Sequence, residues 1–475
     1  MRVRGRRLGD DRVRIERIRT AEYSATEAPK KRRPLPAPLI LILGFAVLIA
    51  IGTALLALPA ASASGQATPL LDALFTATSA VCVTGLIVVD TGTHWSGFGQ
   101  VVILALIQIG GFGFMTSSTL LLLLVVRRRT RLRDRVLVQE TMGAAELGDV
   151  TGLVKRVAIF TLIAEGIGAV VLTLAYVGDH VAGPHPLWFG IFHAVSGFNN
   201  AGIDLLGSVG QISLRGLQTD YLMLGTLGTL IMLGGLGYAI VEDVVRHRRW
   251  ARLALETKVV LVATAALVIV GGSALALLEW NNPQTLGALS VEQRIFGAAF
   301  ESLTLRTAGF SAFDTSALLQ PSLFIVMALM FIGGASGSTA GGIKVNTFSV
   351  LMIAILSTAR GLPSAQAFGR RIEHVVVYRA LAVALLSIAF LFVIALALEL
   401  TTDASFVDVL FEAISAFSTN GASRGITAGL SDAAHVVLIM AMFIGRLGPL
   451  ALVIGLTARR RSVSYRHAVE SIRIG

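Results

Sequence analysis

The sequence has one cysteine, few charged residues and none of the short motifs that mark common enzymes. Cys82 alone cannot form an internal disulfide or a cysteine-based zinc site. The eight histidines show no metal-ligand spacing, and His180 and His185 come closest to a cluster. No glycine-rich phosphate-binding loop is present. Because the sequence offers no convergent catalytic groups, we expect neither enzymatic activity nor a covalently bound cofactor.

Charged residues make up only 15% of the 475 residues, against about 25% in a soluble domain. Hydrophobic residues make up 54%, and many lie in runs of about 20, long enough to cross a bilayer roughly 30 Å thick. The chain is therefore expected to be an integral membrane protein. The expected spans are near residues 38–60, 98–126, 157–178, 220–245, 258–280, 321–357, 376–400 and 434–457.

The formal net charge of +11 comes from basic clusters that adjoin the ends of the apolar runs. No Lys or Arg occurs between Pro34 and Val126. This alternation is typical of cytoplasmic loops, so both termini and all basic clusters are predicted on the cytoplasmic side of the cell membrane. Aromatic residues are not interleaved with the basic ones, which disfavours nucleic acid as a partner.

A short pattern recurs four times between the spans. Phe-x-Ala-x-Ser precedes a glycine by six residues in three copies, which begin at Phe75, Phe192 and Phe411. The fourth copy, Phe300-Glu-Ser-Leu-Thr304, is one residue shorter. The period of roughly 110 residues predicts an internal fourfold repeat. Each copy begins and ends on the same side, so the repeats are expected to be parallel around a pseudo-fourfold axis, not inverted.

The expected fold is thus an all-α membrane protein built from four parallel helix–pore-loop–helix repeats, with eight transmembrane helices and four re-entrant half-helices. The expected divisions are a basic N-terminal tail (1–37), repeat 1 (38–126), repeat 2 (153–246), repeat 3 (257–358) with an intramembrane loop (333–344), repeat 4 (375–457) and a C-terminal tail (458–475).

The half-helices, expected near 69–81, 186–198, 294–305 and 405–417, would point their partially negative C-terminal ends at the axis, which favours a cation. Glycine at the turn allows the backbone to crowd the axis and present carbonyl oxygens, as in a potassium filter. The alternative is a simple small-residue packing motif. The candidate filter residues are Val83, Thr84, Gly85, Asn200, Ala201, Gly202, Thr307, Ala308, Gly309, Thr419, Asn420 and Gly421.

The span near 321–357 is too long for one straight crossing and contains five glycines within ten residues. Irregular backbone at membrane depth must line a cavity, so this loop is a candidate gate beneath the filter, with a static kink as the alternative. The candidate gate residues of the loop are Gly333, Gly334, Gly337, Gly341, Gly342 and Lys344.

Two arginines lie inside apolar segments. Arg446, in the last span, is expected to face the pore below the filter, repel cations and pair with carbonyls of the glycine-rich loop. A packing role is the alternative. Arg306 is expected to face behind the third filter segment and bond backbone carbonyls or a carboxylate such as Glu301.

At these residues the sequence resembles the Trk/Ktr/HKT superfamily of potassium transporters. The similar motifs include Ala77-Thr-Ser-Ala-Val-Cys-Val-Thr-Gly85, Ser196-Gly-Phe-Asn-Asn-Ala-Gly202, Gly337-Ser-Thr-Ala-Gly-Gly-Ile-Lys344 and Phe443-Ile-Gly-Arg-Leu-Gly-Pro449. Trk-type subunits usually carry two additional helices before the first repeat, whereas only polar, Arg-rich residues precede it here. The resemblance therefore implies the eight-helix KtrB type: a homodimer in which each subunit has its own pore and docks on a cytoplasmic ring of nucleotide-binding RCK subunits. K⁺ would be the transported ion, with Na⁺ open as an activator. The retained Gly85 favours K⁺, whereas a Na⁺-permeable or Na⁺-coupled transporter of the same superfamily is the alternative.

A carrier with alternating access is a competing functional hypothesis from a different class of transporter. It predicts intramembrane carboxylates for proton coupling, and Glu165, Glu279 and Glu399 are the candidates. Each of the three is expected near a helix end. The fourfold glycine pattern has no place in that scheme.

Overall fold

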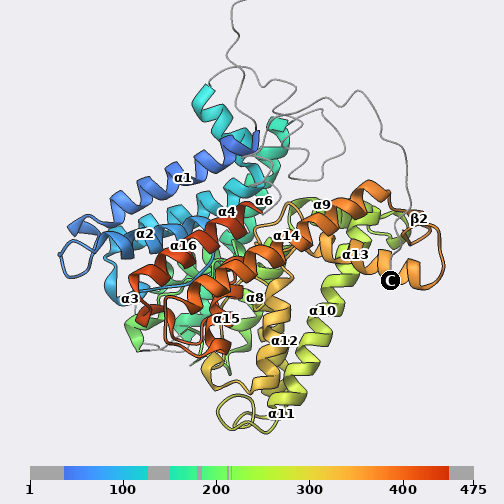
Figure 1. The fold of residues 1–475 in the computed structure, drawn as a ribbon. Helices are drawn as coiled ribbons and strands as arrows, with labels where there is room; N and C mark the ends of the chain where they lie inside the picture. Colours follow the sequence, from blue (N-terminus) through green and yellow to red (C-terminus); the bar gives the residue numbers. More distant parts are fainter. Residues whose placement is uncertain (1–36, 127–149, 179–184, 211–212, 216, 449–475) are drawn as a thin grey trace, which may run out of the picture. The chain divides into compact units, whose positions relative to one another are not determined.

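The computed structural model describes residues 37–126, 150–178, 185–210, 213–215 and 217–448, with side chains for all of these except 37, 38, 114–126, 150, 151 and 153. The described part is mostly α-helical (Figure 1). Its two strands, β1 (Gln366–Ala367) and β2 (Arg370–Arg371), form a small antiparallel pair. The tails, the 127–149 loop and the end of the last expected span, 449–457, lie outside the described residues.

The segments expected as repeats 1 and 2 contain long helices and a shorter one that ends at each predicted filter segment. The helices are α1 (Ala37–Leu56), α2 (Leu70–Cys82), α3 (Thr91–His94), α4 (Gly97–Val126), α6 (Val150–Gly178), α7 (Pro186–Phe198), α8 (Tyr221–Leu236) and α9 (Tyr238–His247). Short 3-10 turns lie at Pro59–Ala61, Leu206–Val209 and Trp250–Arg252.

The segments expected as repeats 3 and 4 follow. Their helices are α10 (Leu255–Glu279), α11 (Val291–Thr304), α12 (Gln320–Phe331), α13 (Val345–Ala359), α14 (His374–Glu399), α15 (Phe406–Ser418) and α16 (Asp432–Leu447), with 3-10 turns at Thr315–Ala317 and Thr427–Gly429. The helix break between α12 and α13, which the glycine-rich sequence predicts, is present at residues 332–344.

Local sequence explains where the half-helices α2, α7, α11 and α15 begin. Pro186 stands at the first turn of α7, where its missing N–H costs nothing. Ser290 and Gln293 form a reciprocal capping box at the start of α11. Ser405 caps α15 by accepting a hydrogen bond from the Asp408 N–H. These caps satisfy backbone donors for which the helix itself supplies no partner.

Helix contacts connect each repeat to the next. Each half-helix packs against the helix that follows another half-helix in the chain: α4 contacts α7, α8 contacts α11, α12 contacts α15, and α16 contacts α2. The contact between α16 and α2 joins the last described helix to one near the start of the chain, and the two lie side by side in Figure 1. The four half-helices therefore follow one another around a closed circle.

The expected span at 220–245 is not one straight helix. It is divided into α8 and α9, which meet at an angle of 95°. The break falls at Gly237, whose φ of +76° is readily available only to glycine. A helix bends sharply where its hydrogen-bond ladder is interrupted, and here the Gly237 N–H closes the last turn of α8 on the Leu233 carbonyl.

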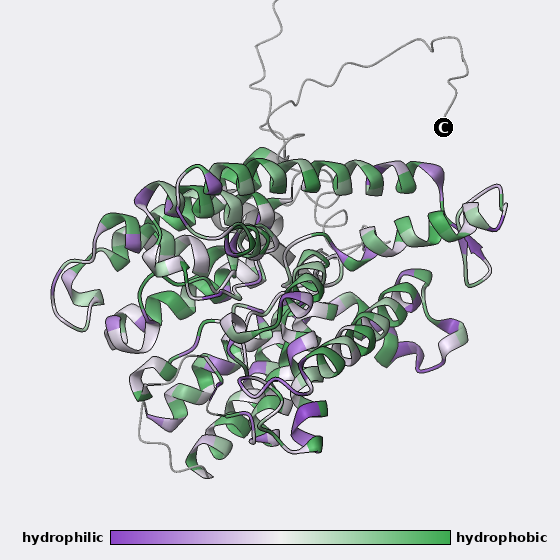
Figure 2. Cartoon of the chain, turned by 60° about the horizontal axis from the view of Figure 1, so that its bottom comes forward, coloured by the Kyte–Doolittle hydropathy of each residue, from purple (hydrophilic) through white to green (hydrophobic). Residues whose placement is uncertain are grey.

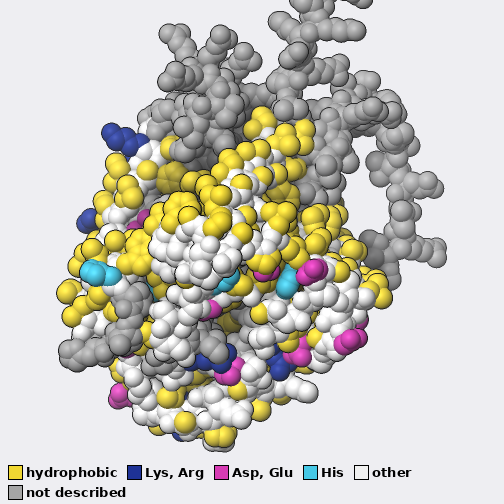
Figure 3. Space-filling model, turned by 90° about the vertical axis from the view of Figure 1, so that its left-hand side faces the viewer, with side chains coloured by type: hydrophobic (Ala, Val, Ile, Leu, Met, Phe, Trp, Pro, Cys, Tyr) yellow, Lys and Arg dark blue, Asp and Glu magenta, His cyan; other side chains and the backbone are white. Residues whose placement is uncertain are grey.

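Apolar side chains cover the outer helices, as a lipid environment requires. Helical segments are predominantly hydrophobic in Figure 2, and hydrophobic side chains cover much of the face in Figure 3. Leu162 and Leu174 of α6 and Phe392 of α14 are each at least 65% exposed. By length and composition, four described helices can cross a membrane, or five if α8 and α9 count as one span. The expected number of eight spans stays a prediction.

Candidate functional site

Four loop segments with an unusual backbone follow the half-helices. Gly85, Gly202, Gly309 and Gly421 all have a positive φ, between +64° and +95°. The residue two positions before each glycine also has a positive φ, although none of these is glycine: Val83 (+55°), Asn200 (+60°), Thr307 (+135°) and Thr419 (+49°). Positive φ at a β-branched residue is a genuine outlier, and such strain clusters at functional sites.

The four glycines form a closed ring with the carbonyls of their neighbours. A Cβ added to Gly85 would collide with the Ala201 carbonyl oxygen, and one on Gly202 with that of Ala308. The same relation continues around the circle, joining Gly309 to the Asn420 carbonyl and Gly421 to the Thr84 carbonyl. Each repeat thus contributes one glycine and one carbonyl to a ring with no room for side chains at the glycines.

The repeated motif positions the residue before each glycine. Its N–H donates to a carbonyl in the last turn of the half-helix, at 2.8–2.9 Å in all four copies. The acceptors are the carbonyls of Ser79, Ser196, Thr304 and Ser415. Thr304 is the counterpart of the three serines, although it stands five residues before its glycine and they stand six. The shorter third copy therefore keeps the same anchor.

Two serine hydroxyls of the motif have a role that the sequence reasoning missed. Ser79 Oγ accepts from the Gly85 N–H at 3.1 Å, and Ser415 Oγ accepts from the Gly421 N–H at 3.2 Å. Both serines are fully buried. The constant six-residue spacing to the glycine was the available signal for this contact.

The chemistry of the ring is that of neutral oxygen ligands. Besides the carbonyls, the hydroxyls of Thr84 and Thr419 are buried with no hydrogen-bond partner among the described residues. No group of three or more His, Cys, Asp or Glu residues that could hold a metal ion exists in the part of the chain that the structure describes. Neutral oxygens suit a weakly hydrated monovalent cation that must also be released.

The 332–344 loop lies against the third and fourth segments. A Cβ on Gly333 would meet Thr307 Cγ2 at 3.0 Å, and one on Gly341 would collide with Thr419 Oγ1. The loop is also held by the end of α8, because the Ala335 N–H donates to the Gly235 carbonyl at 2.8 Å. These bonds satisfy loop backbone that lipid could not satisfy.

Arg446 bonds the same loop. It is 1% exposed, its Nη1 donates to the Thr339 carbonyl, and its Nη2 donates to the Gly110 carbonyl of α4 at 3.2 Å. The expected contact between this arginine and the loop is therefore present, and its function as a gate stays a prediction. Within the loop, Lys344 Nζ donates to the Ala340 carbonyl.

Arg306 also pairs with a backbone carbonyl, which is one of the two kinds of partner expected from the sequence. Its Nη2 donates to the Gly333 carbonyl at 3.3 Å, which connects the third filter segment to the loop. Glu301, the other expected partner, instead accepts from the Ser311 hydroxyl at 2.7 Å.

One of the three candidate carboxylates of the carrier reading does not lie near a helix end. Glu165 is in the middle of α6, is 6% exposed, and accepts from the side-chain amides of Gln108 (3.2 Å) and Asn199 (3.0 Å). Glu279 and Glu399 are the last residues of α10 and α14, as expected. The partners of Glu165 lie on α4 and beside the second filter segment, so its place is explained by tertiary contacts.

Comparison with known proteins gives consistent matches over most of the chain. The sequence profile of the family described as TrkH, cation transport protein, matches residues 23–463. The Ktr system potassium uptake protein B of Bacillus subtilis (strain 168) is 38% identical over 427 residues, which cover 90% of this chain and 94% of that protein. The potassium/sodium uptake protein NtpJ of Enterococcus hirae is 37% identical over 451 residues, which cover 94% of this chain and 98% of that protein.

Among solved structures, the potassium transporter TrkH from Vibrio parahaemolyticus aligns with a TM-score of 0.70. The alignment covers 90% of this chain and 86% of that one at 18% identity, so the likeness concerns the fold alone. It confirms the predicted class, an all-α membrane fold.

Proposed function

We propose that this chain, which belongs to the TrkH family of cation transport proteins, takes up potassium ions across the cytoplasmic membrane through a channel-like pore. Both sequence relatives described above carry potassium uptake in their names. The observation that carries the proposal is the closed ring in which each filter glycine contacts the carbonyl of the next segment.

The carbonyl ring accounts for selectivity on physical grounds. Carbonyl oxygens replace the hydration shell of an ion that holds its water weakly, so K⁺ enters at a lower cost than Na⁺. The C-terminal ends of the four half-helices add a partial negative charge toward the ring. Because no carboxylate belongs to the proposed ligand set, the ion is not bound so tightly that it cannot leave.

The glycine-rich loop and Arg446 form the proposed gate. A cation that leaves the filter would approach a guanidinium in a poorly hydrated space, where repulsion is stronger than in water. The hydrogen bond from Arg446 to Thr339 holds loop and arginine together. Opening then requires the loop to move away, which would also remove a partner of the arginine.

In this proposal a separate chain controls the gate. We propose a homodimer with both termini in the cytoplasm, docked on a nucleotide-binding RCK-type subunit through the basic cytoplasmic segments. The name of the Bacillus subtilis relative, a Ktr system protein B, fits a membrane subunit that has a partner.

The second candidate is transport or coupling of Na⁺. It is favoured by the name of the Enterococcus hirae relative, a potassium/sodium uptake protein.

The test is ion flux into liposomes that contain the purified chain. We expect uptake that follows a K⁺ gradient, a similar rate for Rb⁺, and a much lower rate for Na⁺. Equal rates for K⁺ and Na⁺ would support the second candidate, and no flux with any of these ions, in the parent and in an Arg446→Ala variant that removes the proposed gate, would contradict both.

A further inference from the structure

Two buried carboxylates occupy equivalent places in the third and fourth half-helices. Glu301 and Glu412 each directly follow the phenylalanine of the repeated motif, and they are 2% and 0% exposed. The other two copies have Thr76 and His193 at this position. His193 Nδ1 pairs with the Phe189 carbonyl in its own helix at 2.9 Å. Of the four copies of the motif, the third and fourth therefore have a carboxylate at this position, and the first and second do not.

Glu301 holds the chain as it leaves the third filter segment. One carboxylate oxygen accepts from the Ser311 hydroxyl at 2.7 Å, and the other accepts from the Ala312 N–H at 3.2 Å. Ser311 and Ala312 are the second and third residues after Gly309. The half-helix before the filter and the segment after it are thus joined by one side chain.

Glu412 makes the same connection in the fourth repeat. One oxygen accepts from the Ser423 hydroxyl and from the Arg424 N–H at 3.2 Å, and the other accepts from the Thr427 hydroxyl at 3.0 Å. Ser423 and Arg424 are again the second and third residues after the filter glycine, Gly421. A carboxylate at the same motif position therefore bonds the same two positions after the filter glycine in both segments. A chance pairing would not be expected to occur twice in this way.

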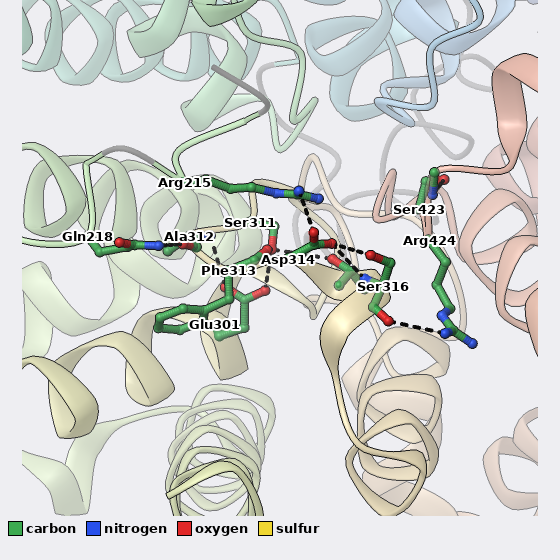
Figure 4. Close-up of polar contacts among 12 residues, drawn as sticks. Arg215, Gln218, Glu301, Ser311, Ala312, Phe313, Asp314, Ser316, Ser423 and Arg424 are labelled. Carbon is green, nitrogen blue, oxygen red and sulfur yellow. Dashed lines mark hydrogen bonds and ion pairs between the residues drawn. The ribbon is translucent and has the colours of Figure 1, made fainter. Parts of the chain in front are cut away.

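The segments held by these carboxylates are also bonded to their neighbours. Figure 4 shows Gln218, which follows the second filter segment, donating to the Ala312 carbonyl at 2.8 Å. In the same view Arg215 forms an ion pair with Asp314 at 2.8 Å. Movement of the third segment would therefore be passed on to the second.

Arg424 connects the fourth segment to the third. Its guanidinium donates to the Ser316 carbonyl at 3.3 Å (Figure 4). It also forms an ion pair with Asp408, in the first turn of α15, at 2.6 Å. Pairing with Asp408 offsets a positive charge that would otherwise act on an approaching cation. The loops after three filter segments thus form one hydrogen-bonded rim.

We propose that Glu301 and Glu412 are positioning residues that determine ion selectivity by holding this rim, and with it the carbonyl ring, in one geometry. This inference rests on the proposed function. Both carboxylates are buried and their oxygens are occupied by donors, so they act on the ion through the backbone and not by binding it. A wider ring would favour K⁺ less, because its carbonyls would no longer replace the hydration shell of K⁺ at matching distances.

The experiment compares leucine and glutamine variants in the liposome flux assay. Glu301→Leu and Glu412→Leu keep the approximate shape and remove every acceptor, so we expect the K⁺/Na⁺ flux ratio to fall roughly tenfold. Glu301→Gln and Glu412→Gln keep one carbonyl acceptor, and the serine and threonine hydroxyls can accept from the new amide. We expect these two variants to stay within about threefold of the parent.

Glu279 supplies the matched control. It is 1% exposed and accepts from the Thr285 hydroxyl at 2.7 Å and the Leu319 N–H at 2.9 Å, at the end of α10 and not beside a filter glycine. Glu279→Leu should lower the thermal unfolding temperature and leave the flux ratio unchanged. A purely structural role of Glu301 and Glu412 would give their leucine variants the same result as this control.

The outcomes separate this inference from the proposed function. The parent must first prefer K⁺, since otherwise the proposed function itself fails. Unchanged ratios in both leucine variants would overturn the positioning role, and so would glutamine variants as impaired as the leucine ones, because charge would then be the cause. If the leucine variants do not fold, Ser311→Ala and Ser423→Ala remove one donor each, and unchanged ratios in both would overturn the role equally.

Discussion

Replacing Gly421 by alanine tests whether contact around the ring determines selectivity. The φ of +93° is unfavourable for alanine by about 1–2 kcal/mol. In addition, the new Cβ would collide with the Thr84 carbonyl and lie 2.9 Å from the Gly85 Cα. Because these are backbone atoms, the ring must open where the fourth repeat meets the first.

The loss of selectivity follows from that displacement. One carbonyl withdrawn from a cation corresponds to about 1.5–3 kcal/mol, the range for hydrogen bonds to charged groups. This converts to a decrease of roughly tenfold to a hundredfold in the preference for K⁺ over Na⁺. Initial flux rates of the two ions into liposomes at equal gradients measure this preference.

Gly425 provides a control four residues away. Its φ of +88° gives alanine a similar backbone cost, but a Cβ there would meet no atom within 4 Å. Gly425→Ala should therefore lose stability without a change in the K⁺/Na⁺ flux ratio. If Gly421→Ala and Gly425→Ala have the same ratio, backbone strain alone explains the effect of Gly421, and contact around the ring does not control selectivity.

Three further predictions concern the filter, the gate and the partner. Gly85→Ser and Gly202→Ser should raise Na⁺ flux relative to K⁺, because either side chain would displace a neighbouring carbonyl of the ring; unchanged ratios in both would mean that the filter is elsewhere. Deleting residues 335–338, or making Arg446→Ala, should raise K⁺ flux in the absence of a partner, and two folded variants that conduct no faster than the parent would place the gate elsewhere. Calorimetry should detect no tight nucleotide binding by the purified chain, which lacks a phosphate-binding loop; submicromolar binding would contradict the assignment of control to another subunit.

The half-helices were predictable from the sequence because the same pattern occurs four times. The expected ranges differ from α2, α7, α11 and α15 by at most three residues at either end. The helix break at 332–344 was predictable for a related reason, since five glycines within ten residues cannot continue an apolar helix. Repetition and composition are properties that a single sequence displays directly.

The bend at Gly237 was not predicted, although Gly234, Gly235 and Gly237 lie within four residues, because glycine is also frequent in continuous membrane helices. Glu165 was misplaced for a different reason. Its partners, Gln108 and Asn199, lie 57 and 34 residues away on other elements. A carboxylate within an apolar run is paired only after tertiary contacts form, and those contacts leave no local signal in the sequence.

The carboxylates of the third and fourth half-helices illustrate the same limit. Glu301 and Glu412 stand within the repeated motif, yet their function depends on donors that follow the filter glycine by two and three residues. The spacing was visible in both repeats. Only the structure shows that each carboxylate points toward the segment that follows the filter glycine.

The central claim is that carbonyl oxygens of the ring bind the transported ion. Anomalous X-ray scattering from crystals in which K⁺ is replaced by Rb⁺ tests it most directly. We expect a peak on the ring axis, in contact with the carbonyls of Thr84, Ala201, Ala308 and Asn420. Rb⁺ peaks found only outside an otherwise ordered ring would contradict the account.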